Sequence, residues 1–253
     1  IRDRAYVEAG AQILCANTFG ANREKLGRTG RTVEEVVPPS VEIARRAARG
    51  RALVALDVGP TGQLLEPTGT LRFEEAVDIF AQTVRAGVQA GADLILIETM
   101  TDLQEARAAL LAAKENSSLP VIVTMTYEER GRTFLGCDPA SAALTLEGMG
   151  ADAIGVNCSL GPREMPPLVR ELTRWSTLPI AIKPNAGLPD PGGAGYDITA
   201  EEFAGSMAEL TGLGVKLYGG CCGTTPEYIA LLREKLAGCT IVQVPRQVPA
   251  AVC

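Results

Sequence analysis

The sequence predicts an α/β fold, in the form of a (β/α)8 TIM barrel, and two observations lead to this class. Short apolar stretches alternate with stretches that carry helix-start signals along the chain of 253 residues. The apolar stretches are continuous rather than alternating, which is typical of parallel strands buried on both faces. A phrase of helix end, glycine and apolar strand also recurs, as in VEAGAQIL at 7–14 and VQAGADLI at 88–95. The glycine can take the left-handed conformation that ends a helix.

Seven strands are expected in order along the chain, separated by helices. They cover about residues 12–19, 52–59, 94–100, 120–127, 153–160, 180–185 and 215–221. Five of the helices have recognisable starts, either a capping-box spacing or a capping residue before proline. These starts are Thr32 with Glu35, Thr101 with Gln104, Asp138-Pro139, Thr199 with Glu202, and Thr225-Pro226.

The alternation of strands and helices fits either a barrel or a doubly wound open sheet. No glycine-rich phosphate fingerprint follows an early strand, which favours the barrel. Seven strands are one too few for its closure, and residues 1–9 have the pattern of a helix end. We therefore expect a barrel at residues 1–238 that lacks its first strand, within a longer protein. Residues 239–253 have the prolines of a linker or tail.

Composition narrows the function classes. The 24 basic and 30 acidic residues give a net charge of −6, with no basic stripe for nucleic acid. No apolar run is long enough to cross a membrane, and no signal peptide is visible. Seven cysteines, an odd number, do not resemble a disulfide framework and indicate a reducing cytoplasm. No special role is expected for Cys15, Cys137, Cys239 and Cys253.

Three cysteines are the strongest functional candidates. Cys158 ends the fifth expected strand, and Cys221 with Cys222 ends the seventh. The carboxyl ends of barrel strands meet at one face, so these thiols are expected to converge. The chain has no histidine, and three thiolates would leave a zinc ion one ligand short of four, as in catalytic zinc sites. The alternative is that they are small core residues, because Cys-x-x-Cys spacing is absent.

Four further polar residues end strands at the same expected face: Thr18, Asp57, Glu98 and Asn185. Asp57 can be explained as a turn residue before Gly59-Pro60, and Thr18 and Asn185 as partners of backbone groups. Glu98 follows three apolar residues, and burying an unpaired carboxylate is costly, so it is the better candidate.

Several segments together resemble the homocysteine S-methyltransferase family. They are ANTFGANR at 16–23, GPTG at 59–62, IET at 97–99, GVNCS at 155–159, KPNAG at 183–187 and GGCCGTTP at 219–226. Within the family the chain is most similar to the homocysteine-binding module of cobalamin-dependent methionine synthases. The family usually opens with a strand bearing Asp-Gly, which is absent here. Tyr228 and Ala16 stand where many members have histidine and threonine.

The resemblance implies that Cys158, Cys221 and Cys222 bind zinc and that the homocysteine sulfur is the fourth ligand. It implies that Glu98 holds the substrate ammonium group and that Asn157 and Thr18 help to orient the substrate. The expected activity is methyl transfer to the thiol of homocysteine, which gives methionine.

These segments do not identify the methyl donor. A methyl-corrinoid donor is expected, with methylcobalamin carried by a partner protein or another domain. S-methylmethionine or betaine is the alternative donor. Two other functions stay open: a fragment that binds zinc or homocysteine without turnover, and a lyase that uses Glu98 and Lys183 without zinc.

Overall fold

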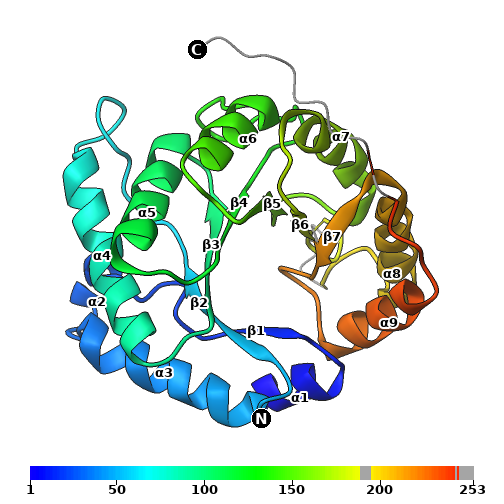
Figure 1. The fold of residues 1–253 in the computed structure, drawn as a ribbon, viewed down its shortest axis with the longest axis horizontal. Coiled ribbons are helices and arrows are strands. Elements are labelled where there is room, and N and C mark those ends of the chain that lie inside the picture. Colours follow the sequence, from blue (N-terminus) through cyan, green and yellow to red (C-terminus); the bar gives the residue numbers. More distant parts are fainter. Residues whose placement is uncertain (189–194, 243, 245–253) are drawn as a thin grey trace.

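Seven parallel strands form one curled sheet in the computed structural model, which describes residues 1–188, 195–242 and 244. The strands follow chain order around the sheet, and helices surround its outer face (Figure 1). They are β1 (Ile13–Cys15), β2 (Leu53–Val58), β3 (Leu94–Met100), β4 (Val121–Met125), β5 (Ala153–Asn157), β6 (Ile180–Lys183) and β7 (Val215–Tyr218). Each lies within a segment that the sequence predicted, so the α/β barrel-like fold with one strand too few is confirmed.

Helices precede, connect and follow the strands. They are α1 (Arg2–Glu8), α2 (Arg23–Gly27), α3 (Val33–Ala48), α4 (Phe73–Gln89), α5 (Leu103–Asn116), α6 (Pro139–Gly148), α7 (Met165–Trp175), α8 (Ala200–Glu209) and α9 (Pro226–Ala237). Two short 3-10 turns, Pro162–Glu164 and Leu210–Leu213, precede α7 and β7. Within the described part of the chain, every helix is too short or too polar to span a bilayer.

Most of the expected helix starts are confirmed. Complete capping boxes open α3 at Thr32 and α8 at Thr199, and the Asp138 side chain accepts the backbone N–H of Ser141 at the start of α6. Such bonds satisfy N–H groups that have no partner within the helix. Thr225 precedes α9 at the expected place, although its side chain makes no capping bond.

The expected capping box of Thr101 with Gln104 is wrong. The residue that caps α5 is Asp102, whose carboxylate accepts the backbone N–H of Gln104 at 2.9 Å. Both residue types can cap a helix, but the chain turns into α5 only at Leu103, which places Asp102 at the capping position.

The sheet separates two apolar cores. The larger one lies between the strands and the surrounding helices. The smaller one lines the inside of the curl and contains Ala55, Leu94, Leu96, Ile122, Ala153 and Ala181. Side chains alternate along a strand, so the inner face continues toward the carboxyl ends with Asp57, Glu98, Thr124, Asn157 and Lys183. A polar layer therefore lies above an apolar one inside the curl.

The sheet does not close among the described residues, because β1 pairs only with β2 and β7 only with β6. A cavity of about 1050 Å³ extends along this gap and is lined by residues of α1, β1, β7 and α9. Tyr6 of α1 lines this cavity, and its hydroxyl donates to the Thr224 carbonyl at 3.1 Å. The expected first strand and longer protein stay predictions, as does the division of the chain at residue 238. Most of the predicted tail, at 243 and 245–253, lies outside the described residues.

Candidate metal and substrate site

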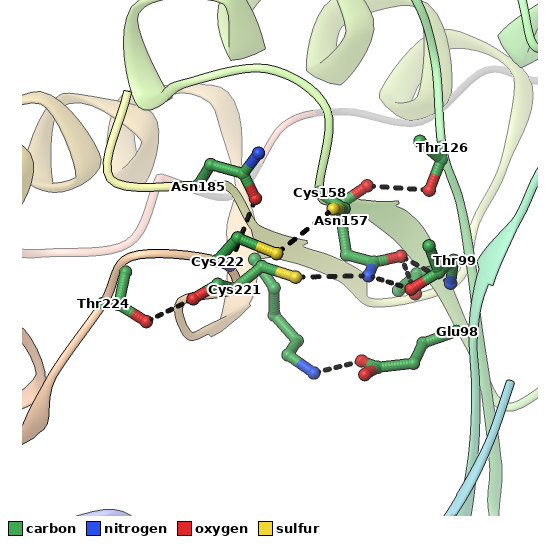
Figure 2. Close-up of polar contacts among 11 residues, drawn as sticks. Glu98, Thr99, Thr126, Asn157, Cys158, Asn185, Cys221, Cys222 and Thr224 are labelled. Atoms are coloured by element: carbon green, nitrogen blue, oxygen red, sulfur yellow. Dashed lines mark hydrogen bonds and ion pairs between the residues drawn. The ribbon is translucent and has the colours of Figure 1, made fainter. Parts of the chain in front are cut away.

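The three predicted cysteines come together at the carboxyl ends of β5 and β7 (Figure 2). Their sulfur atoms all lie within 4.8 Å of one another, and Cys158 Sγ is 3.8 Å from Cys222 Sγ. A tetrahedral zinc ion with Zn–S bonds of about 2.3 Å holds its sulfur ligands about 3.8 Å apart. The spacing therefore fits three thiolate ligands of one zinc ion. An ion held by three protein ligands takes its fourth ligand from water or substrate.

The segment that follows β6 joins the two cysteine segments. The backbone N–H of Cys158 donates to the Lys183 carbonyl, and that of Cys221 donates to the Pro184 carbonyl, at 3.0 and 2.8 Å. Asn185 accepts the backbone N–H of Cys222 through Oδ1 at 3.2 Å. Three consecutive residues thus fix the backbone on both sides of the sulfur cluster. Asn185 acts here on the backbone, which is one of the roles that the sequence left open for it.

A glycine is required directly after the cysteine pair. Gly223 has a φ of +80°, in the left-handed region, and a Cβ there would lie 2.3 Å from the ring of Tyr196. Desolvation and the neighbouring Cys222 sulfur raise the pKa of Tyr196. The tight turn therefore holds Tyr196 beside the cluster.

The sulfur atoms share protons unequally in the metal-free protein. The neighbouring thiol of Cys221 lowers the pKa of Cys158 to about 6. The proximity of Cys158 raises the pKa of Cys221, and burial raises that of Cys222. One thiolate is thus stabilised by two thiols, and a bound cation would favour deprotonation of all three.

Asn157, the residue before Cys158, is fully buried beneath the cluster. Its Nδ2 lies 3.8 Å from Cys221 Sγ and donates to Thr99 Oγ1 at 2.8 Å. Its Oδ1 accepts from the Thr99 N–H and from Thr124 Oγ1, both at 2.8 Å. All of these contacts are with other residues of the protein. The role of Asn157 in orienting the substrate stays a prediction.

Glu98 of β3 points into the curl (Figure 2). It forms an ion pair with Lys183 of β6, which lines the same cavity. Asp57 is buried near both, and its Oδ1 has no hydrogen-bond partner among the described residues. Desolvation by burial raises the pKa of Asp57, and the Glu98 charge adds to the effect. Desolvation opposes the charge of Lys183, yet Cys15, Glu98 and Asp57 raise its pKa. With both carboxylates ionised, the three charged side chains carry a net charge of −1.

Thr18 lies at the same end of the sheet, where its hydroxyl bridges to β2. It donates to the Asp57 carbonyl at 2.8 Å and accepts the Asp57 N–H at 3.0 Å. The sequence analysis gave this bridging of backbone groups as the alternative role of Thr18. A contact of Thr18 with the substrate stays a prediction. Thr18 fixes the backbone that carries Asp57.

Sequence reasoning missed several partners in this site. Lys183 was given a role only in the alternative lyase, and Thr99, Thr124 and Tyr196 were given none. The alternation of β6 gave a signal for Lys183, since it lies two residues after the inward-facing Ala181. Glu98, Lys183, Asp57 and Cys221 all line the same cavity, so the charged layer and the sulfur cluster share one solvent space.

The fold and the site together define a barrel-like α/β protein with a three-cysteine cluster at the carboxyl ends of its strands, where a metal ion could bind. The sequence pattern of the homocysteine S-methyltransferase family matches residues 3–236, so the chain belongs to this family. It is 34% identical to the methionine synthase of Mycobacterium leprae (strain TN) and 35% identical to that of Mycobacterium tuberculosis (strain ATCC 25618 / H37Rv), over 96% of this chain in both cases. The chain spans about a fifth of these relatives, 21% and 22% of their lengths.

Solved structures share the fold. The metallated form of the homocysteine methyltransferase MmuM from Escherichia coli superimposes with a TM-score of 0.77 at 22% identity, over 92% of this chain and 83% of that one. A dihydrodipicolinate synthase gives a TM-score of 0.53 at 16% identity, over 94% of this chain and 68% of that one. These similarities support the barrel architecture alone, because the identities are low.

Proposed function

We propose that this chain binds homocysteine and zinc and supports transfer of a methyl group to the homocysteine thiol, which gives methionine. The observation that carries the proposal is the three-sulfur cluster, whose 3.8 Å spacing suits zinc, in a chain of the homocysteine S-methyltransferase family. Cys158, Cys221 and Cys222 would hold the ion. When bound, zinc supplies a positive charge that keeps a substrate thiol deprotonated at neutral pH.

The charged layer supports recognition of an amino acid. Glu98 would bind the substrate ammonium by a charge-assisted hydrogen bond, within the cavity that it shares with Cys221. When Asp57 is ionised, Asp57, Glu98 and Lys183 sum to −1, so one added ammonium group balances their charge. Asn157 and Thr18 would orient the substrate through the groups that they hold rather than by direct contact.

The proposed methyl donor is methylcobalamin, carried by a corrinoid-binding domain or partner protein in the cytoplasm. The support is the similarity to two methionine synthases that extend far beyond the region matched by this chain. S-methylmethionine and betaine are the alternative donors, and either would react without a corrinoid protein.

The proposal is tested first by metal content. The purified chain is expected to hold one zinc ion, measured by mass spectrometry of the metal. Zinc should be lost from Cys158→Ala, Cys221→Ala and Cys222→Ala, and retained in the control Cys239→Ala, whose thiol lies outside the cluster. Full zinc occupancy in a variant lacking all three cluster cysteines would overturn the site.

A donor panel then separates the remaining functions. Methionine formation from homocysteine is measured with methylcobalamin, S-methylmethionine or betaine. A protein that binds zinc and homocysteine but transfers no methyl group from any of them is a binding fragment. A protein that holds no zinc supports the lyase alternative, which uses Glu98 and Lys183.

A further inference from the structure

We infer that Asn157 is a positioning residue that sets both the metal-binding sulfur of Cys221 and the substrate-binding carboxylate of Glu98. This inference rests on the proposed function and adds a link between its two halves. The metal half lies on β5 and β7, and the ammonium half lies on β3. The Asn157 side chain contacts Cys221 in the metal half and Thr99, the residue after Glu98, in the ammonium half (Figure 2).

The link begins at an irregularity in β3. Ile97 pairs with Val123 and Met100 pairs with Met125, so β3 has one residue more than β4 between these pairs. Such a bulge redirects a side chain and leaves a backbone group without its partner in the ladder. The extra length falls at Glu98 and Thr99. The free Thr99 N–H donates to Asn157 Oδ1, so the side chain replaces the missing strand partner.

The backbone at this point adopts a conformation that needs support. Thr99 has a φ of 62°, in the left-handed region that β-branched residues rarely adopt. The Asn157 amide makes two hydrogen bonds to Thr99, because Oδ1 accepts the Thr99 N–H and Nδ2 donates to Thr99 Oγ1. Glu98 precedes Thr99 directly, so these two bonds fix the direction in which the Glu98 carboxylate points.

The same amide reaches the metal half. Its second N–H lies toward Cys221 Sγ at 3.8 Å, within the range of a weak hydrogen bond to sulfur. The backbone carbonyl of Asn157 accepts from Thr126 Oγ1 at 3.0 Å, immediately before Cys158 with its φ of 61°. Hydrogen bonds to the ligands of a metal orient them and tune their affinity.

Asn157 has no capacity left for a substrate. A primary amide offers two donors and one oxygen with two lone pairs. Both donors and both acceptor sites are used, by Thr99, Cys221 and Thr124. With no exposed surface, the side chain acts through its neighbours rather than on the substrate.

The test compares Asn157→Asp with Asn157→Ala in the full chain. Aspartate has the same shape and can still accept from Thr99 and Thr124. It cannot donate to Cys221 Sγ or to Thr99 Oγ1, and it brings a negative charge to the thiolates. Alanine removes every contact and adds no charge. The control Thr124→Val removes one hydrogen bond to Oδ1 and leaves the contacts to Thr99 and Cys221 intact.

Three readouts separate positioning from loss of fold. Zinc affinity is measured by competition with a chromophoric chelator, homocysteine affinity by calorimetry of the zinc-loaded protein, and folding by thermal unfolding of the metal-free protein. The sulfur-to-metal charge-transfer bands of the cobalt-substituted protein report the geometry of the cluster directly.

Both Asn157 variants are expected to bind zinc about 10- to 100-fold more weakly and to show altered cobalt bands, as for other residues that support metal ligands. Homocysteine affinity should also fall by about tenfold or more in both. Thr124→Val should change either affinity by less than about threefold. If Asn157→Ala does not fold, Asn157→Asp alone decides the question.

Two outcomes overturn the inference. One is an Asn157→Asp variant with unchanged zinc affinity and unchanged cobalt bands. The other is a variant whose zinc affinity falls while its homocysteine affinity does not, because the link to Glu98 is then absent. A wild-type chain that binds zinc but not homocysteine would instead overturn the proposed function.

Discussion

At the scale of single residues, charge arrangement governs the site. Asp57, Glu98 and Lys183 lie on the inner face of the curled sheet, where both carboxylates are buried. Buried charges need partners, but only Glu98 is ion-paired with Lys183, while Asp57 Oδ1 has no hydrogen-bond partner among the described residues. This imbalance leads to two predictions, one about substrate binding and one about stability.

Glu98→Gln is expected to weaken homocysteine binding and to leave zinc in place, because it removes the charge partner of the substrate ammonium and no metal ligand. The expected loss is about 1.5–3 kcal/mol, the usual contribution of a hydrogen bond to a charged group. Calorimetry on the zinc-loaded protein measures it. The matched control is Glu105→Gln, a buried carboxylate bonded to Thr61 and absent from the cavity lining. Equal homocysteine affinity in the wild type and Glu98→Gln would remove Glu98 from the site.

Asp57→Asn is expected to change how stability depends on pH. Burial raises the pKa of Asp57 above its ordinary value of 3.8, so the folded state binds a proton more tightly than the unfolded state does. This carboxyl therefore lowers the free energy of unfolding as pH rises above 3.8, by about 1.4 kcal/mol per unit of pKa shift once it is fully ionised. Asparagine removes that dependence. In urea unfolding, the variant should gain more over the wild type at pH 8 than at pH 4.5, and an equal difference at both pH values would contradict the prediction.

At the scale of elements, the turns after β5 and β7 carry the three cysteines, while the charged residues of the site lie within strands. Cys158 follows β5 and the cysteine pair follows β7, each in a turn with a left-handed residue. The segment after β6 holds both turns by backbone hydrogen bonds. The geometry of the sulfur cluster thus depends on backbone conformations that few residues can adopt.

Gly223→Ala tests this dependence. A side chain at a φ of +80° costs about 1–2 kcal/mol, and the added Cβ would also meet the Tyr196 ring at 2.3 Å. We expect a lower melting temperature and weaker zinc binding, measured by thermal unfolding and chelator competition. Gly205→Ala is the control, since it lies within α8 and its Cβ would meet nothing within 4 Å. It should be neutral or stabilising, because alanine favours helix. Wild-type zinc affinity in Gly223→Ala would contradict the requirement for glycine.

The elements were predictable to the extent that local patterns determine them. Continuous apolar runs located all seven strands, because both faces of the sheet are buried. The convergence of the cysteines was predictable because the carboxyl ends of the parallel strands in a barrel meet at one face. The start of α5 was missed because Thr101 and Asp102 are adjacent capping residues and only the path of the chain selects one. The pairing of Glu98 with Lys183 and the hydrogen bonds of Asn157 to Thr99 depend on the curl of the sheet and on the bulge in β3, which no local pattern encodes.

At the scale of the whole molecule, the sheet has two free edges. Among the described residues β1 and β7 each pair on one side only, while β2 to β6 pair on both. Free edges expose backbone groups to water or to another chain. The additional strand that the sequence predicts would lie between β7 and β1. The protection of the two edge strands can be measured.

Hydrogen exchange should show the edges directly. Amides of β1 and β7 that face the gap are expected to exchange much faster than those of β3 to β5, because they lack ladder partners. Mass spectrometry of peptides from 13–15 and 215–218 against 94–100 and 121–125 makes the comparison. An upstream segment that supplies the predicted strand should slow exchange at both edges. Equal protection of edge and central strands in the present chain would mean that the gap is closed in solution.

The position of the metal ligands along the chain has a consequence for synthesis. Cys158 precedes Cys222 by 64 residues, and the Tyr6 hydroxyl of the first helix bonds to Thr224 across 218 residues. Because a ribosome releases the amino-terminal part first, a nascent chain contains every strand up to β6 and still lacks two of its three sulfur ligands. At the proposed site, binding of zinc through all three sulfurs must therefore wait until β7 and the cysteine pair after it have emerged. The order of synthesis thus makes the cysteine pair the last part of the proposed site to become available.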